Sequence, residues 1–129
     1  MSKTADYIHE IELAFIASPA IQSFEILRTT VNSDTGFIRI RAKLRNEDFL
    51  EVAEFFVWEQ NQIHTLTYRY QWMSPDQQTL RKRWDNAPHY PELAQFPHHV
   101  HDGDELTVRP GEPLTLLTWL PLLEKLLPE

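Results

Sequence analysis

The spacing of apolar residues predicts a helix near the N-terminus. Between residues 5 and 17, apolar side chains recur three and four positions apart, at Ile8, Ile11, Ala14 and Phe15. This spacing places side chains on one face of a helix. The residue before a proline disfavours the helical conformation, so the helix should end where Ser18 precedes Pro19. We therefore expect an amphipathic helix from Ala5 to Ala17.

A strict alternation of apolar and basic residues follows over residues 37–45. The apolar positions are Ile38, Ile40, Ala42 and Leu44, and the basic positions are Arg39, Arg41, Lys43 and Arg45. A period of two is that of a half-buried strand, here with a basic outer face. Segments rich in β-branched and aromatic residues predict further strands at residues 23–31, 48–59, 63–73 and 79–84.

Leucines predict a second helix from about Pro113. They lie at Leu114, Leu116, Leu117, Leu120, Leu123, Leu126 and Leu127. Pro113 suits the first turn of a helix, whereas Pro121 should kink or break it. The leucines cover more than one narrow stripe, so this helix should close the core or offer an apolar surface to a partner. Together, the elements predict a single α+β domain over residues 1–129, an antiparallel sheet of about five strands with an N-terminal helix and a C-terminal helix.

Composition and charge narrow the class of protein. With 129 residues, 42% of them hydrophobic, the chain has the size of one globular domain. It has no cysteine, which excludes disulfides and thiolate metal sites and favours a cytoplasmic location. The N-terminus lacks the apolar core of a secretory signal, and no apolar run approaches the roughly 18 residues of a membrane span, so we expect no membrane partner. The formal charge of −7 opposes loose binding to nucleic acid but allows a local basic patch.

Four of the six histidines lie in the segment RWDNAPHYPELAQFPHHVH, from Arg83 to His101. If its end is extended, His99 and His101 point to one side; if it is helical, His98 and His101 share a face. In one interpretation, either pair would bind a divalent metal. In a second, two histidines would supply the base and the acid for cleavage of RNA through the 2′-hydroxyl. Further metal ligands would come from His89, Asp102 or Asp104. In a third interpretation, the imidazoles hydrogen-bond the backbone and hold a proline-rich loop closed.

Cations and an aromatic residue beside the histidines suit a phosphodiester substrate. Arg81 and Arg83 would steady a phosphate, and Trp84 would stack on a base. Alternatively, the arginines decorate a solvated edge strand and Trp84 belongs to the core. Asp85 and Asn86 should start a turn through their own side chains.

Glu54 interrupts the apolar face of a predicted strand. Its neighbours on that face are Leu50, Val52, Phe56 and Trp58. A carboxylate there must be paired or have a raised pKa. Arg83, Tyr68 and Tyr70 are available as partners on other strands. The alternative is a strand irregularity that returns Glu54 to solvent.

These motifs together resemble the TumE family of toxins from toxin–antitoxin systems. The family pattern consists of xYxYxx, RWDNAPHxPEL, FPHHxH and an acidic GDE. The matching residues are Tyr68, Tyr70, Arg83 to Asn86, Pro88, His89, Pro91 to Leu93, Phe96 to His99, His101 and Gly103 to Glu105. The LEVAEFF that contains Glu54 also fits, whereas Val100 stands where family members often have lysine. The resemblance implies a small toxin encoded beside a helix-turn-helix antitoxin.

The residues themselves favour RNA as the substrate of a metal-independent, ribonuclease-like toxin that needs no cofactor. The candidate catalytic residues are His89, His98, His99, His101, Arg83 and Glu54. The candidate substrate-binding residues are Arg81, Trp84, Tyr68, Tyr70, Asp85 and Asn86. Two alternatives stay open: a non-catalytic module that binds a protein partner, and a metal-dependent nuclease that holds a divalent ion at the same histidines. A homodimer also stays open.

Overall fold

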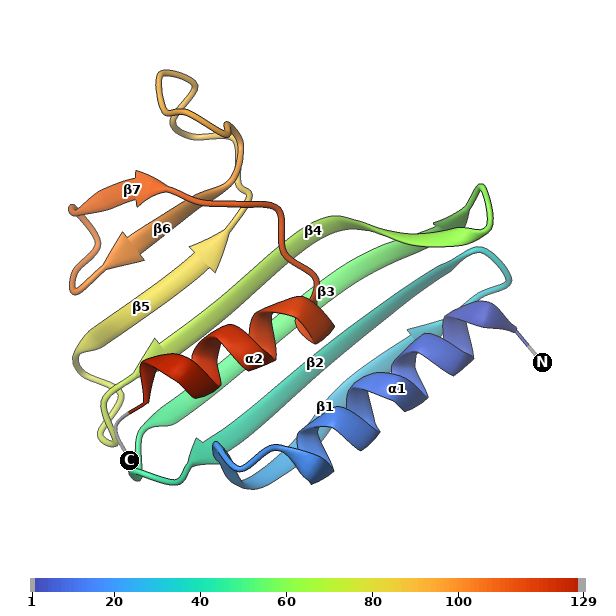
Figure 1. Ribbon diagram of the computed structural model, residues 1–129, viewed down its shortest axis with the longest axis horizontal. Helices are drawn as coiled ribbons and strands as arrows, with labels where there is room; N and C mark the ends of the chain where they lie inside the picture. The colour runs from blue at the N-terminus through green and yellow to red at the C-terminus, as the bar shows by residue number, and fades with distance from the viewer. Residues whose placement is uncertain (1, 128–129) are drawn as a thin grey trace.

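A computed structural model describes residues 2–127 and shows two helices on one face of a single antiparallel sheet (Figure 1). Within these residues the sheet has seven strands, and each strand pairs with its neighbours in the sequence, in the order β1 to β7. The elements are α1 (Lys3–Ala17), β1 (Ile21–Val31), β2 (Thr35–Leu44), β3 (Phe49–Glu59), β4 (Gln62–Met73), β5 (Leu80–Asp85), β6 (His99–Asp102), β7 (Val108–Pro110) and α2 (Leu116–Leu126).

The core lies between the helices and one face of the sheet. The apolar side of β2 is buried there as its alternation predicts, together with Ile11 and Phe15 of α1 and Trp119 and Leu123 of α2. Helix α1 starts at Lys3 because the side chain of Ser2 accepts a hydrogen bond from the backbone N–H of Ala5, at 3.1 Å. The opposite side of the sheet, called here the open face, carries the basic side of β2.

The α+β architecture with terminal helices is confirmed, but the expectation of about five strands is wrong. The two additional strands, β6 and β7, contain four and three residues. Segments this short are too brief for an alternation of polarity to be recognised. The end of the histidine segment is therefore a strand, His99–Asp102, rather than part of a loop.

Helix α2 continues through Pro121 to Leu126, so of the expected kink or break at Pro121 the break does not occur. Pro121 is exposed, while Leu116, Leu120 and Leu123 on the other side are buried. A proline inside a helix costs about 3 kcal/mol. Burial of each leucine contributes about 1.5–3 kcal/mol, so three of them outweigh that cost.

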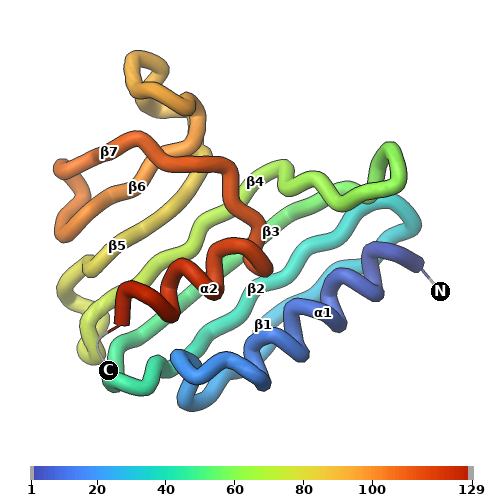
Figure 2. The backbone as a smooth tube through the Cα atoms, viewed as in Figure 1, coloured from blue at the N-terminus to red at the C-terminus, as the bar shows by residue number. Residues whose placement is uncertain are grey.

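Two connections position the histidine segment. Figure 2 shows the chain between β5 and β6 projecting from one end of the sheet, and the chain after β7 running back across the sheet to begin α2. Residues 86–98, called here the 86–98 segment, connect β5 to β6. The segment therefore begins and ends beside these two strands, where the candidate residues are concentrated.

Candidate functional site

The pairing of six strands aligns one row of residues across the open face. From β1 to β6 the row consists of Arg28, Arg39, Ala53, Arg69, Asp85 and His99. Neighbouring strands lie roughly 4.8 Å apart, so the row spans about 24 Å. It leads from three arginines to a carboxylate and an imidazole.

A second row runs beside the first. From β1 to β6 it consists of Glu25, Arg41, Glu51, Gln71, Arg83 and His101. Residues two apart in a strand point to the same face. His101 therefore projects beside His99, and Arg83 beside Asp85, which confirms that the histidine pair belongs to an extended segment and that the helical pairing of His98 with His101 is wrong.

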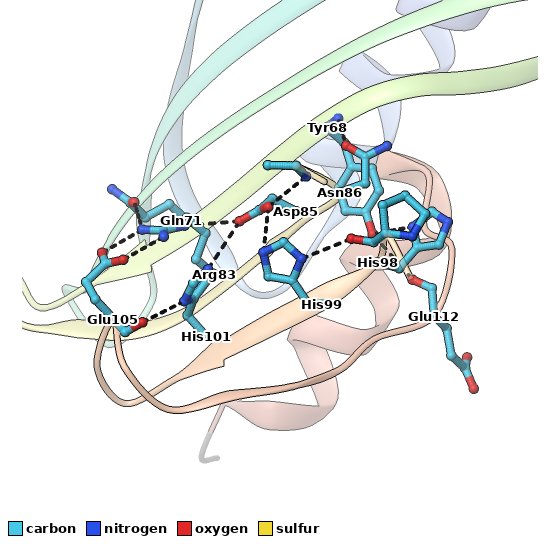
Figure 3. A network of polar contacts seen from close by, with 12 residues as sticks. Tyr68, Gln71, Arg83, Asp85, Asn86, His98, His99, His101, Glu105 and Glu112 are labelled. Atoms are coloured by element: carbon cyan, nitrogen blue, oxygen red, sulfur yellow. Dashed lines mark hydrogen bonds and ion pairs between the residues drawn. The ribbon is translucent and has the colours of Figure 1, made fainter. Parts of the chain in front are cut away.

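Asp85, His99 and His101 form a buried group, called here the Asp–His group (Figure 3). The Nε2 atom of His99 lies 2.9 Å from Oδ1 of Asp85. The Nε2 atom of His101 lies 3.7 Å from Oδ2 of the same carboxylate. Both imidazoles thus direct the same ring atom at one carboxylate.

Backbone carbonyls fix the orientation of both rings. Nδ1 of His99 lies 3.0 Å from the carbonyl oxygen of Pro97, and Nδ1 of His101 lies 3.0 Å from that of Glu105. A carbonyl oxygen only accepts hydrogen bonds, so each Nδ1 carries a proton and a neutral ring presents the lone pair of Nε2. Burial lowers the pKa of His101, which favours its neutral form.

Arg83 positions the carboxylate of Asp85. Its Nε donates to Oδ2 of Asp85 at 3.2 Å, and its two terminal nitrogens donate to both oxygens of Glu105, at 2.7 and 2.6 Å. The hydrogen bonds to Glu105 raise the pKa of Arg83, and the same contact lowers the pKa of Glu105. Two carboxylates already neutralise Arg83, so it orients Asp85 rather than offering a cation for a phosphate.

A pocket of about 660 Å³ opens above the Asp–His group. Arg69 and His89 line it, and Tyr90 of the 86–98 segment stands edge-on to both imidazoles, with ring centroids 5.0 Å from His99 and 6.0 Å from His101. His89 is exposed, and its imidazole forms no hydrogen bond within residues 2–127.

His98 lies on the other side of β6. The hydroxyl of Tyr68 lies 3.0 Å from Nδ1 of His98, and the two rings stack with centroids 5.8 Å apart. His98 lines a separate pocket of about 350 Å³ with His64 and Thr118. Burial lowers the pKa of His98. The alternation of the strand therefore separates His98 from the predicted catalytic partners His99 and His101.

Glu54 forms a second buried network on the helix side of the sheet. Its carboxylate accepts hydrogen bonds at 2.7 Å from Tyr7 and from Thr65, and at 3.3 Å from Tyr70 and from the backbone N–H of Leu116. Burial raises the pKa of Glu54, as the sequence predicted for a carboxylate at this position. The network joins α1, β3, β4 and the start of α2, and Glu54 does not line the pocket of the Asp–His group.

The candidate substrate-binding residues are divided between core and surface. Trp84 is buried edge-on to Trp119, with centroids 5.6 Å apart, so its ring has no face open to a base. Tyr70 is fully buried. Arg81 pairs with Asp48 at 3.3 Å and lies outside the pocket.

Asn86 and Tyr68 do line the pocket, with Asp85. The side chain of Asn86 is engaged with β4, because it accepts from the backbone N–H of Tyr68 at 3.0 Å and donates to the carbonyl of Leu66 at 3.0 Å. It extends the β4–β5 pairing beyond Asp85 and fixes the start of the 86–98 segment.

Sequence reasoning missed Arg69 and Tyr90. The alternation in TYRY places Arg69 on the face opposite the two tyrosines, but only the strand register places it opposite Asp85. No periodic signal marks Tyr90, because it lies in an irregular segment.

The comparisons with known proteins agree with the resemblance seen in the sequence. A family model described as Toxin TumE matches residues 10–129. The chain therefore belongs to the TumE toxin family, which makes it the toxin of a toxin–antitoxin pair and implies an antitoxin partner. No curated protein and no solved structure matches the chain. No helix within residues 2–127 is long and apolar enough to span a bilayer.

Proposed function

We propose that this toxin cleaves RNA at the pocket of the Asp–His group. The observation that carries the proposal is the row of arginines on the open face, which leads directly to that pocket. Arg28, Arg39 and Arg69 form no ion pair with a carboxylate within residues 2–127. A chain of formal charge −7 thus keeps three arginines without a carboxylate partner in one row, and Arg69 lies at the pocket of the Asp–His group.

Aromatic side chains accompany the arginines. Phe37 and Phe55 are directly opposite each other on β2 and β3. The guanidinium carbons of Arg28 and Arg39 lie 5.7 and 5.9 Å from the centroid of the Phe37 ring. Arginines that track a phosphate backbone next to rings that stack on bases are the arrangement of single-stranded nucleic-acid sites, where stacking contributes about 1–3 kcal/mol per base.

The pocket supplies the groups that cleavage of a phosphodiester needs. In the proposed reaction a 2′-hydroxyl of RNA loses its proton to the Asp–His group. The resulting oxyanion attacks the adjacent phosphorus, and the bond from phosphorus to the 5′-oxygen breaks. The departing 5′-oxygen takes a proton from His89, and Arg69 stabilises the charge of the phosphate.

The test is cleavage of RNA by the purified toxin and by two arginine variants. Arg69→Gln should lower the rate on single-stranded RNA by about 10–100-fold, because it removes a cation beside the scissile phosphate. Arg109→Gln is the matched control, since Arg109 is exposed on β7 and pairs with Asp102; it should leave the rate within about 2-fold, as surface ion pairs contribute little. Equal rates for Arg69→Gln and the parent, or intact RNA after growth arrest, would refute the proposal.

A second candidate is a toxin that binds a protein without turnover. Helix α2 favours it, because Leu122 and Leu126 remain 36% and 40% exposed. Growth arrest that persists in Arg69→Gln and leaves RNA intact would select this candidate. The helix-turn-helix type of the antitoxin and a homodimer remain predictions, which co-purification from the native operon and a mass measurement in solution would test.

A further inference from the structure

The Asp–His group contains an unbalanced set of lone pairs. Both Nδ1 atoms lie 3.0 Å from backbone carbonyl oxygens, so the two Nε2 atoms are the ring atoms left to face the carboxylate of Asp85. One proton between His99 and Asp85 would satisfy the contact of 2.9 Å. It would not satisfy His101, whose Nε2 points at the same carboxylate from 3.7 Å, beyond hydrogen-bonding distance.

A single cation between the three side chains would satisfy all of these lone pairs at once. We infer that Asp85, His99 and His101 bind one divalent transition-metal ion of the Zn²⁺ type. Two imidazoles and one carboxylate suit Zn²⁺, Mn²⁺ or Fe²⁺ rather than Mg²⁺ or Ca²⁺, which prefer oxygen ligands throughout.

The distances fit such an ion. The three donor atoms all lie within 4.8 Å of one another. Bonds of about 2.0–2.2 Å from a tetrahedral Zn²⁺ place its donors roughly 3–4 Å apart. Shifts of less than about 1 Å, within the reach of side-chain rotation, would therefore complete the coordination.

The surroundings of the group resemble the supporting shell of a metal site. Imidazoles that bind a metal usually donate their other N–H to a carbonyl or carboxylate, as His99 and His101 do toward Pro97 and Glu105. Asp85 is held in turn by Nε of Arg83 and by the backbone N–H of Ala87, at 3.2 and 3.0 Å. These contacts fix all three donors without occupying the Nε2 atoms.

The fourth side of the site faces the pocket, so an ion there would keep a position for water or substrate. Three protein ligands and one open position are typical of a catalytic rather than a structural zinc site. Binding of the ion does not depend on RNA being the substrate. Its part in cleavage, as the ion that helps remove the proton of the 2′-hydroxyl, does rest on the proposed function.

The experiment measures metal binding by the full-length toxin without a histidine tag, after treatment with a chelator. Titration calorimetry with Zn²⁺ and the visible spectrum of added Co²⁺ should each show about one ion per chain, with no binding of Mg²⁺ in the same range. His99→Gln and His101→Gln should each weaken binding on the order of 100-fold. His98→Gln is the matched control, because the imidazole of His98 contacts Tyr68 on the other side of β6. The His98→Gln variant should bind Zn²⁺ with an affinity within about 2-fold of the parent.

Circular dichroism of each variant checks its fold. X-ray absorption of the parent with bound Zn²⁺ should show two imidazole ligands, a readout that needs no variant. Absence of Zn²⁺ and Co²⁺ binding by the parent, or an equal loss in His98→Gln and His99→Gln, would overturn the inference. RNA cleavage by a parent protein that binds neither Zn²⁺ nor Co²⁺ in the titrations refutes the metal site and keeps the proposed function. Tight Zn²⁺ binding without RNA cleavage does the reverse.

Discussion

Replacement of Glu54 by glutamine should change the stability of the toxin in a manner that depends on pH. The carboxylate is fully buried and has a raised pKa because burial disfavours its charge more than four hydrogen bonds favour it. A carboxyl group with a raised pKa in the folded state contributes stability that is fully present below the pKa of the unfolded chain. That stability is lost as the pH rises through the folded pKa.

Glutamine has nearly the same shape but does not ionise. Below about pH 4, where Glu54 is protonated in both states, the two proteins should have similar stability. At higher pH the parent loses stability relative to Glu54→Gln, by about 1.4 kcal/mol for each unit by which the folded pKa exceeds the unfolded one. For a chain of this length, each kcal/mol corresponds to about 3–5 °C in Tm.

Differential scanning calorimetry of both proteins between pH 4 and pH 8 measures this effect. The difference in Tm isolates Glu54, because the other titrating groups are common to both chains. The Tm of Glu54→Gln relative to the parent should rise with pH. A difference that stays constant as the pH rises would mean that the hydrogen bonds from Tyr7, Thr65, Tyr70 and Leu116 balance burial, and a difference that falls would mean that they outweigh it. Either result would refute the reasoning.

Two further substitutions test the packing of the sheet and the role of the Tyr68–His98 pair. Gly36→Ala should destabilise the fold by about 1–3 kcal/mol in urea denaturation, because the new Cβ would lie 2.4 Å from the ring of Phe56; an unchanged midpoint would show that the ring moves aside without cost. Tyr68→Phe should cost about 0.5–1.5 kcal/mol through the lost hydrogen bond to His98. RNA cleavage should stay within about 2-fold of the parent, because the hydroxyl that is removed contacts His98, which does not line the pocket of the Asp–His group. Loss of cleavage in a folded Tyr68→Phe would instead place His98 in the site.

The candidate site shows where sequence reasoning succeeds. The sequence offered two pairings, His99 with His101 in an extended chain or His98 with His101 in a helix. The structure selects the first, because residues 99–102 form strand β6. The prediction that Glu54 must be paired or have a raised pKa was also correct, because a carboxylate between apolar neighbours has few other solutions. The same reasoning placed Glu54 in the catalytic set, whereas the structure places it in a separate network below the helices.

Contacts between strands show where prediction from the sequence fails. Arg83 was predicted to hold a phosphate, but the bidentate contact with Glu105 and the contact with Asp85 depend on the position of the β6–β7 turn. Trp84 was predicted to stack on a base, and the alternative of a core residue was also open. The position of α2 decides between these two roles of Trp84, because Trp119 of α2 packs against the ring of Trp84 in the core.

The sequence by itself determined the two helices, the five longer strands with their two-sided character, and the absence of thiol chemistry, because periodicity and composition are local properties. Only the tertiary structure decided which side chains meet, since a shift of one residue in register sends a side chain to the other face. The bulge at Leu27 shows the effect: Ile26 pairs with Ile40 on the core side, yet Arg28 pairs with Arg39 on the open face. The row from Arg28 to His99 exists because five successive registers align, and no single segment of the chain contains that information.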